Sequence, residues 1–205
     1  MIPDPCFELI AAAQYFYQQG WMVGTAGNLS ARLPDGSFWI TASGKSKGNL
    51  TLDDFVQVHP DGRIEAVPTL KPSAELIIHQ TLYNQFPEAQ ACYHVHSVEA
   101  NLVSRFADTE TLPLPPLEML KGLGIWAENP HGAIAVFPNH LNVEQIALEI
   151  QQRFQANPPQ IPALLIRDHG LTVWASSTES AQNFVELLEY IFRYMVLARQ
   201  IKLEN

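Results

Sequence analysis

Three histidines have the types and spacing needed to hold a divalent metal ion. His94 and His96 are separated by one residue at the end of an apolar stretch, 91–96, that predicts a strand. Side chains alternate along a strand, so both imidazoles face the same side, with their backbones about 6.5 Å apart. His169 ends a second apolar stretch and is followed by Gly170, where a side chain can reach a cleft. Three protein ligands with an open fourth position are typical of a catalytic rather than a structural zinc site.

The residues alone leave other interpretations of these histidines open. A pair of histidines with this spacing also occurs as two polar residues on an exposed strand face, and a single histidine often simply ends a strand. The three together favour a divalent metal site over these alternatives. The remaining histidines give weaker signals, because they lie beside prolines or turns, in a loop or within a helix: His59, His79, His131 and His140.

Two carboxylates are candidates for proton transfer. Glu75, in the segment 71–75, falls in the first turn of a predicted helix, where the helix dipole alone favours an acid. Glu118, in the segment 116–122, follows a proline-rich connector predicted over residues 109–116, and a solvated face is its plain alternative. A metal-polarised carbonyl acidifies the neighbouring carbon, and a nearby carboxylate can take that proton. Both residues therefore have a catalytic and a structural interpretation.

Two loops rich in small residues, 24–30 and 43–48, are candidates for binding an anion. Backbone amides in such loops form concave sites for anions, to which hydroxyls and a lysine can add. Lys45 and Lys47 stand out in a chain with 12 Lys+Arg against 21 Asp+Glu. Neither loop matches a Walker A or a dinucleotide-binding sequence. Two ordinary turns are the alternative.

The elements that would position these residues are helices mixed with short strands. Five helices are predicted, from Pro5 up to Gly20, over residues 74–85, from Ser97 to 106, over 143–155 and over 178–202. Asp4, Ser73, Ser97 and Asn142 can cap the first four of them. Strands are predicted over residues 29–33, 37–41, 91–96, 133–137, 163–167 and 171–175, with a further pair joined across Asp61-Gly62. This pattern predicts an α/β protein with a mixed or antiparallel sheet and helices packed on it. Without a repeat or a linker, we expect one domain over residues 1–205.

The composition excludes several classes of protein. A chain of 205 residues with 47% hydrophobic residues can bury one core and is not intrinsically disordered. A formal net charge of −9 argues against a nucleic-acid partner. Two cysteines, Cys6 and Cys92, cannot form a disulfide framework. No segment reads as a signal peptide or a membrane span, so we expect a cytoplasmic protein with no membrane partner.

Five short segments, in this order and spacing, resemble the class II aldolase/adducin family across nearly the whole chain: Gly27-Asn28-Leu29-Ser30, Thr41-Ala42-Ser43-Gly44, Lys71-Pro72-Ser73-Ala74-Glu75, His94-Val95-His96 and His169-Gly170. The resemblance implies a three-layer α/β/α fold with a mostly antiparallel central sheet. It implies one Zn²⁺ per subunit held by the three histidines, and assembly as a homotetramer with active sites near subunit contacts. The phosphate pocket that it implies consists of Gly27, Asn28, Ser43, Gly44 and Ser73.

Within that family, the segments 116–122 and 167–170 and the strand at Trp174 look like the methylthioribulose-1-phosphate dehydratases of methionine salvage. This implies a metal-assisted conversion of 5-methylthioribulose 1-phosphate to 5-methylthio-2,3-dioxopentyl 1-phosphate, in which Glu118 takes the C3 proton. In the family's aldolases, the position of Glu75 is the acid/base and lies near the metal. Some dehydratases carry a cysteine close to Glu75. This chain has none there, so a role for that thiol does not transfer.

Two other functions stay open from the sequence. Another class II sugar-phosphate aldolase or epimerase would share the histidines, the phosphate loops and Glu75. A non-catalytic, adducin-like interaction protein would be expected to lack the ligand histidines. The segment around Glu118 favours the dehydratase, acting on a small sugar phosphate.

Overall fold

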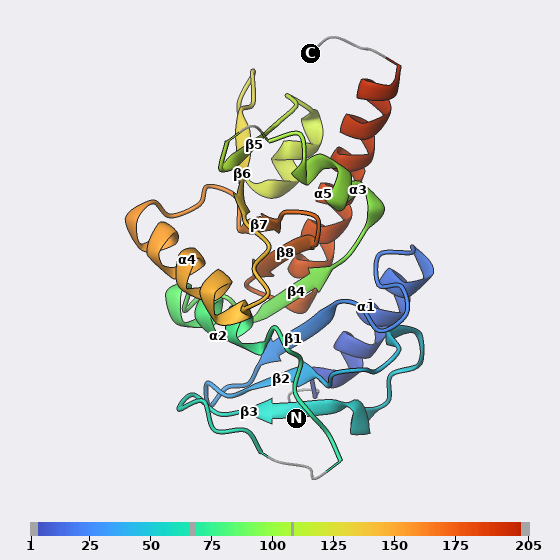
Figure 1. Cartoon of the computed structure of the whole chain (residues 1–205), viewed down its shortest axis with the longest axis vertical. Helices are drawn as coiled ribbons and strands as arrows, with labels where there is room; N and C mark the ends of the chain where they lie inside the picture. The colour runs from blue at the N-terminus through green and yellow to red at the C-terminus, as the bar shows by residue number, and fades with distance from the viewer. Residues whose placement is uncertain (1–3, 66–68, 108, 202–205) are drawn as a thin grey trace.

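The computed structural model of this chain describes residues 4–65, 69–107 and 109–201. Its eight strands in these ranges form one sheet in the order β3-β2-β1-β4-β8-β7-β6-β5 (Figure 1). Every neighbouring pair is antiparallel except β6 and β7, which are parallel. The strands are β1 (Asn28–Arg32), β2 (Phe38–Thr41), β3 (Phe55–Val58), β4 (Ala91–Val95), β5 (Thr111–Leu114), β6 (Gly132–Phe137), β7 (Ala163–Ile166) and β8 (Gly170–Ala175).

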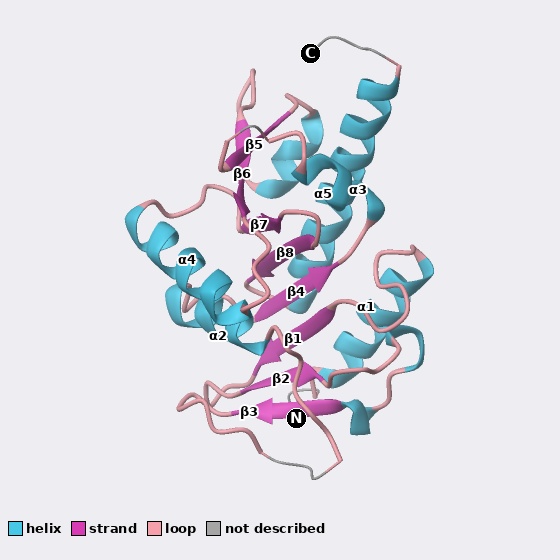
Figure 2. Cartoon of the chain, viewed as in Figure 1, coloured by secondary structure: helices cyan, strands magenta, loops and turns pink. Residues whose placement is uncertain are grey.

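Helices cover both faces of this sheet (Figure 2). On one face lie α2 (Leu76–Gln85) and α4 (Val143–Ala156), and on the other lie α1 (Cys6–Gln18), α3 (Val98–Ser104) and α5 (Thr178–Gln200). Three short 3₁₀ turns connect these elements: η1 (Lys47–Asn49), η2 (Leu52–Asp54) and η3 (Glu118–Leu123). The predicted three-layer α/β/α fold with a mostly antiparallel sheet is confirmed.

The alternation of side chains along β4 divides the core into two layers. Tyr93 and Val95 pack in the layer beneath α1 and α5, whereas Cys92 packs in the layer beneath α2 and α4. His94 has the parity of Cys92 and therefore faces the α2 side. The strand that carries the predicted metal ligand thus points it at the start of α2.

Local signals in the sequence account for several helix ends. The Asp4 carboxylate accepts a hydrogen bond from the Cys6 amide at 2.9 Å. The Ser97 hydroxyl accepts from the Ala100 amide at 2.8 Å, so it caps α3, which follows β4. These interactions satisfy backbone amides that a helix leaves free in its first turn.

The prediction of a connector over residues 109–116 is wrong, because this segment contains β5. This strand pairs antiparallel with β6, with Pro113 opposite Ala133. A proline is tolerated there because β5 is the edge strand and needs no donor on its outer side. The proline content of the segment therefore marks a sheet edge.

Two further predictions near residue 70 need correction. The strand expected after Asp61-Gly62 is reduced to a single bridge between Val58 and Ile64, and residues 66–68 lie outside the described residues. The helix predicted from residue 74 begins at Leu76. The Ser73 hydroxyl accepts a hydrogen bond from the Glu75 amide at 3.2 Å, so the segment turns before the helix begins.

Within the described ranges, no helix is both long enough and apolar enough to cross a membrane.

Candidate metal centre

The three predicted ligand histidines lie together where the end of one strand meets the start of its neighbour. His94 is in β4, His96 directly follows β4, and His169 directly precedes β8. The ring centroids are 4.6 Å apart for His94 and His96, 5.0 Å for His94 and His169, and 4.6 Å for His96 and His169. Because β4 and β8 are antiparallel neighbours, the end of one strand meets the start of the other. The pairing of β4 with β8 therefore brings the three histidines together.

Gly170 permits this close approach. A Cβ at this position would lie 2.2 Å from the carbonyl oxygen of Val95 and 3.1 Å from Cε1 of His94. Asp168, two residues earlier, has a left-handed backbone with φ of 54°. The turn before β8 is therefore tight enough to aim His169 at the two histidines of the neighbouring strand.

Glu75 is the fourth member of the cluster. One ligand atom from each of Glu75, His94, His96 and His169 lies within 4.8 Å of all the others. Oε1 of Glu75 is 2.8 Å from Nε2 of His169, and Oε2 is 3.4 Å from Nε2 of His94. The carboxylate comes from the turn just before α2, on the face of the sheet toward which His94 points.

These side chains fit a divalent metal ion. Nδ1 of His94 shares a hydrogen bond with the Thr172 hydroxyl at 2.9 Å, and Nδ1 of His169 donates to Oδ1 of Asn139 at 3.3 Å. Such outer contacts orient metal-binding imidazoles and direct Nε2 of both rings toward the centre of the cluster. Nε2 of His96 is buried and has no hydrogen-bond partner in the described part of the chain, and a bound ion would satisfy it. Imidazole nitrogens with a carboxylate oxygen are a donor set that zinc takes.

Burial sets the protonation of the cluster. It lowers the pKa of His94 to about 4 and that of His96 to about 3, with the neighbouring His94 adding to the effect at His96. Burial opposes ionisation of Glu75, but the facing His94 and His169 hold the pKa of its carboxyl below the ordinary value. Near neutral pH, His94 and His96 are thus uncharged and Glu75 is a carboxylate, which are the forms that bind metals.

The predicted phosphate loops lie beside this cluster. Ala42 pairs with Pro72, and the Ser43 amide donates to the Lys71 carbonyl at 2.8 Å. Nζ of the buried Lys47 donates to the carbonyl oxygens of Thr25 at 3.0 Å and Lys45 at 2.9 Å. The loops that contain Gly27, Ser43, Gly44 and Ser73 are thereby joined to one another.

Two of the predicted phosphate-binding residues also build the metal centre. Nδ2 of Asn28 donates to Oε2 of Glu75 at 2.5 Å, and Oδ1 of Asn28 is 2.5 Å from Nε2 of His79. Both polar ends of the Asn28 side chain are therefore engaged. Gly27 has a φ of +76°, and a Cβ there would lie 2.7 Å from the carbonyl oxygen of His94. Contacts at the cluster thus account for the residue types at both positions.

Glu118 lies apart from the four clustered residues. It is the first residue of η3, which packs against α5, and its side chain is 80% exposed. Its carboxylate forms an ion pair with Lys121 at 3.1 Å. Within a single chain, the structure brings Glu75 to the histidines and leaves Glu118 at the surface.

His79 is a residue whose role at this site the sequence analysis missed. It is fully buried and reaches the cluster through Asn28. Its spacing of four residues from Glu75 was the available signal, because residues four apart share one side of a helix.

Comparison with known proteins agrees with this fold. Residues 7–196 match the model of the Class II Aldolase and Adducin N-terminal domain. The chain belongs to the class II aldolase and adducin family.

Two curated relatives and one solved structure are similar to this chain. It is 62% identical to methylthioribulose-1-phosphate dehydratase of Microcystis aeruginosa, over 97% of this chain and 98% of the relative. It is 43% identical to the Leptospira biflexa protein of the same name, over 95% and 96%. The structure of L-fuculose-1-phosphate aldolase from Thermus thermophilus superposes with a TM-score of 0.77 at 24% identity, over 98% of this chain and 97% of the aldolase. This last likeness shows the fold alone.

Proposed function

We propose that this protein is a zinc-dependent lyase that removes water from 5-methylthioribulose 1-phosphate and forms 5-methylthio-2,3-dioxopentyl 1-phosphate. The observation that carries the proposal is the partly buried cluster of three histidines and Glu75. Its strongest support beyond the site is the 62% identity to a methylthioribulose-1-phosphate dehydratase over nearly the full length of both chains.

In this proposal, His94, His96 and His169 hold one Zn²⁺ per subunit. The ion, when bound, supplies stabilisation of negative charge on a substrate oxygen, which acidifies the neighbouring carbon. Thr172 and Asn139 keep the rings of His94 and His169 in a binding orientation.

The substrate phosphate is bound by the joined loops. Ser43 and Ser73 offer hydroxyls and Gly44 a backbone amide, because the Ser43 amide already donates to the Lys71 carbonyl. Gly27 and Asn28 contribute backbone, since the side chain of Asn28 is engaged with Glu75 and His79. Binding the phosphate there fixes the sugar carbons relative to the cluster.

Glu118 is the proposed base of the reaction. It takes the proton from C3, the electron pair forms a C3–C4 double bond, and the C4 hydroxyl leaves as water after taking a proton from the same carboxyl or from another acid. The resulting enol then tautomerises to the 2,3-diketone. A positioned general base contributes about 10²–10⁴-fold, so Glu118→Gln should lose that much in kcat and keep its metal.

The exposure of Glu118 gives this proposal a further consequence. In its own chain, Glu118 lies outside the cluster on a solvent-exposed turn. A homotetramer, which the family resemblance implies, lets Glu118 serve the cluster of a neighbouring subunit. A complete site would then combine Glu75 and the histidines of one subunit with Glu118 of the next.

Mixed oligomers test this arrangement. Glu75→Gln and Glu118→Gln proteins, each inactive alone, are unfolded together, refolded and assayed for dehydration. If Glu118 acts in the neighbouring site, random mixing restores about one quarter of the wild-type activity, because that fraction of sites receives both intact residues. The Glu118→Gln protein refolded alone is the control. Failure to restore any activity in verified hybrids contradicts the shared site.

A sugar-phosphate aldolase is the second candidate, and one observation favours it. Glu75 lies in the cluster, at the position of the acid/base in the family's aldolases, whereas Glu118 does not. If Glu118→Gln dehydrates at the wild-type rate while Glu75→Gln is inactive, Glu75 is the base. In that case the protein is still a dehydratase, and only the assignment of Glu118 is lost. Cleavage of a sugar phosphate into two carbon fragments by the wild type, without loss of water, is the result that favours the aldolase.

A further inference from the structure

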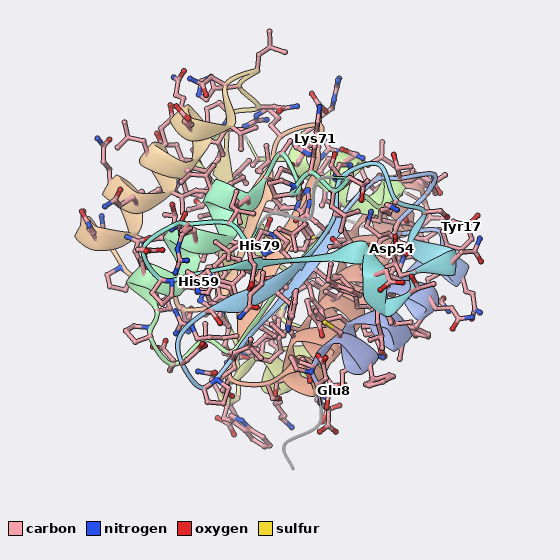
Figure 3. All side chains as sticks on the ribbon, turned by 90° about the horizontal axis from the view of Figure 1, so that it is seen from below. Glu8, Tyr17, Asp54, His59, Lys71 and His79 are labelled. Atoms are coloured by element: carbon pink, nitrogen blue, oxygen red, sulfur yellow. The ribbon has the colours of Figure 1, made fainter. Side chains whose placement is uncertain are left out.

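A line of buried polar groups connects α2 to β1 behind the metal centre. Nε2 of His79 is 2.5 Å from Oδ1 of Asn28, and Nδ1 of His79 is 2.7 Å from the Ser30 hydroxyl. The Ser30 hydroxyl is in turn 2.8 Å from the Tyr83 hydroxyl. All four side chains are at least 97% buried, and His79 is labelled in Figure 3.

The spacing of these residues matches two regular elements. Asn28 and Ser30 are two residues apart on β1 and therefore share one face of the sheet. Glu75, His79 and Tyr83 are four residues apart along α2 and the turn before it, so they follow one side of the helix. The helix and the strand thus face each other with polar side chains in matching positions, and Glu75 stands at the end beside the histidines.

The chemistry of these groups fixes the direction of every hydrogen bond. A carboxylate only accepts, so the Asn28 amide nitrogen donates to Glu75 and its oxygen must accept from Nε2–H of His79. Burial lowers the pKa of His79 to about 4 and keeps the ring neutral, so its Nδ1 accepts from the Ser30 hydroxyl. The Ser30 proton goes to this nitrogen because His79 is 2.7 Å away and the Cys92 carbonyl oxygen, the other acceptor, is 3.4 Å away, so Ser30 accepts from Tyr83. One tautomer of His79 and one orientation of Asn28 satisfy the whole line.

This line holds the Glu75 carboxylate by one oxygen. Oε2 accepts from Asn28, while Oε1 faces His169 at 2.8 Å. We propose that His79, acting through Asn28, is a positioning residue that fixes how the Glu75 carboxylate faces the three ligand histidines. This inference rests on the metal centre of the proposed function and adds the group that orients its carboxylate. The competing explanation is that His79 is only a well-bonded histidine of the core.

Two substitutions at one position separate these explanations. The amide nitrogen of His79→Gln reaches about as far as Nε2 and keeps a donor for Asn28. The amide of His79→Asn reaches about as far as Nδ1, so it keeps a partner for Ser30 and loses the contact with Asn28. Hydrogen-bonded groups around the ligands of a metal site typically change metal affinity by about 10–100-fold when they are disturbed. We expect His79→Asn to weaken zinc binding by that factor and His79→Gln to stay within a few-fold of the wild type.

The measurement is the dissociation constant for Zn²⁺ of the metal-free protein, in competition with a chelating dye, with the melting temperature as a check on folding. The same substitutions are made in Glu75→Gln. If His79 acts through the carboxylate, His79→Asn weakens binding much less in that background than in the wild type. Equal weakening in both backgrounds, or equal loss in both His79 variants, overturns the proposal.

This test is independent of the reaction that we propose. Zinc affinity can be measured without substrate. If the His79 variants differ in zinc affinity as expected but the protein dehydrates nothing, the proposed function is overturned and the positioning role is kept. If the protein is a dehydratase but His79→Asn leaves its zinc affinity unchanged, the positioning role is overturned and the proposed function stands. A wild-type protein that binds no zinc would overturn both.

Discussion

Glu189 should make the stability of this protein depend on pH in a way that one substitution removes. It lies on α5 with 2% of its surface exposed, and neither carboxylate oxygen has a hydrogen-bond partner among the described residues. Burial raises the pKa of Glu189 to about 8, an effect that Ser97 reduces and Glu99 increases. The folded protein therefore holds a proton at Glu189 that the unfolded chain releases near pH 4.5.

The magnitude follows from these two pKa values. Because the pKa is raised in the folded state, the stabilising contribution is fully present below about pH 4.5 and is lost as the pH rises through about 8. A pKa difference of this size corresponds to roughly 5 kcal/mol when the group is fully ionised, and roughly 3 kcal/mol of it falls between pH 5 and pH 8. Glu189→Gln cannot ionise and should lose this component of the pH dependence.

The assay is urea unfolding of the wild type and Glu189→Gln at pH 5 and pH 8. The comparison uses the change between the two pH values, because an unpartnered glutamine amide has its own cost of about 1–3 kcal/mol at both. Glu186→Gln is the matched control, since Glu186 is on the same helix, is less buried and accepts a hydrogen bond from Gln182 at 2.9 Å. The wild type and the control should both lose stability from pH 5 to pH 8 relative to Glu189→Gln. If the free energy of unfolding changes equally from pH 5 to pH 8 in all three proteins, the raised pKa of Glu189 is refuted.

Three more substitutions test the site. His96→Ala leaves two ligand histidines and should sharply reduce zinc content, measured by elemental analysis of the purified protein; equal zinc in both proteins would end the three-histidine assignment. Ser43→Ala should mainly raise KM, since phosphate binding contributes equally to ground and transition states, and steady-state kinetics would contradict this by showing a large loss in kcat at unchanged KM. Gly170→Ala places a Cβ 2.2 Å from the Val95 carbonyl oxygen and should cost about 1–3 kcal/mol, seen as a lower urea midpoint; an unchanged midpoint would show that the two strands can separate without cost.

The clustered histidines could be predicted from the sequence because much of their geometry is local. The alternation of a strand alone puts His94 and His96 on one side, and Gly170 after His169 indicates a tight turn. The pairing of β4 with β8, which brings His169 to the other two, is a long-range fact that the residues suggest only by their combination.

The parts that sequence reasoning missed depend on long-range pairing. β5 is an edge strand with a proline, and nothing in its own residues distinguishes it from a connector until β6 lies beside it. His79 looks like any histidine within a helix until Asn28, 51 residues away, meets it across the layer. The exposure of Glu118 likewise follows from how η3 packs against α5, a helix that begins 60 residues after Glu118, which no local spacing determines.

The product formed from 5-methylthioribulose 1-phosphate tests the central claim most directly. Zinc-loaded wild-type protein is incubated with this substrate, and the products are identified by mass spectrometry, with His96→Ala as the control. We predict a single product that has lost one water and still carries the phosphate and the methylthio group on one carbon chain. Two fragments that separate the phosphate from the methylthio group, or a substrate left unchanged, would contradict it.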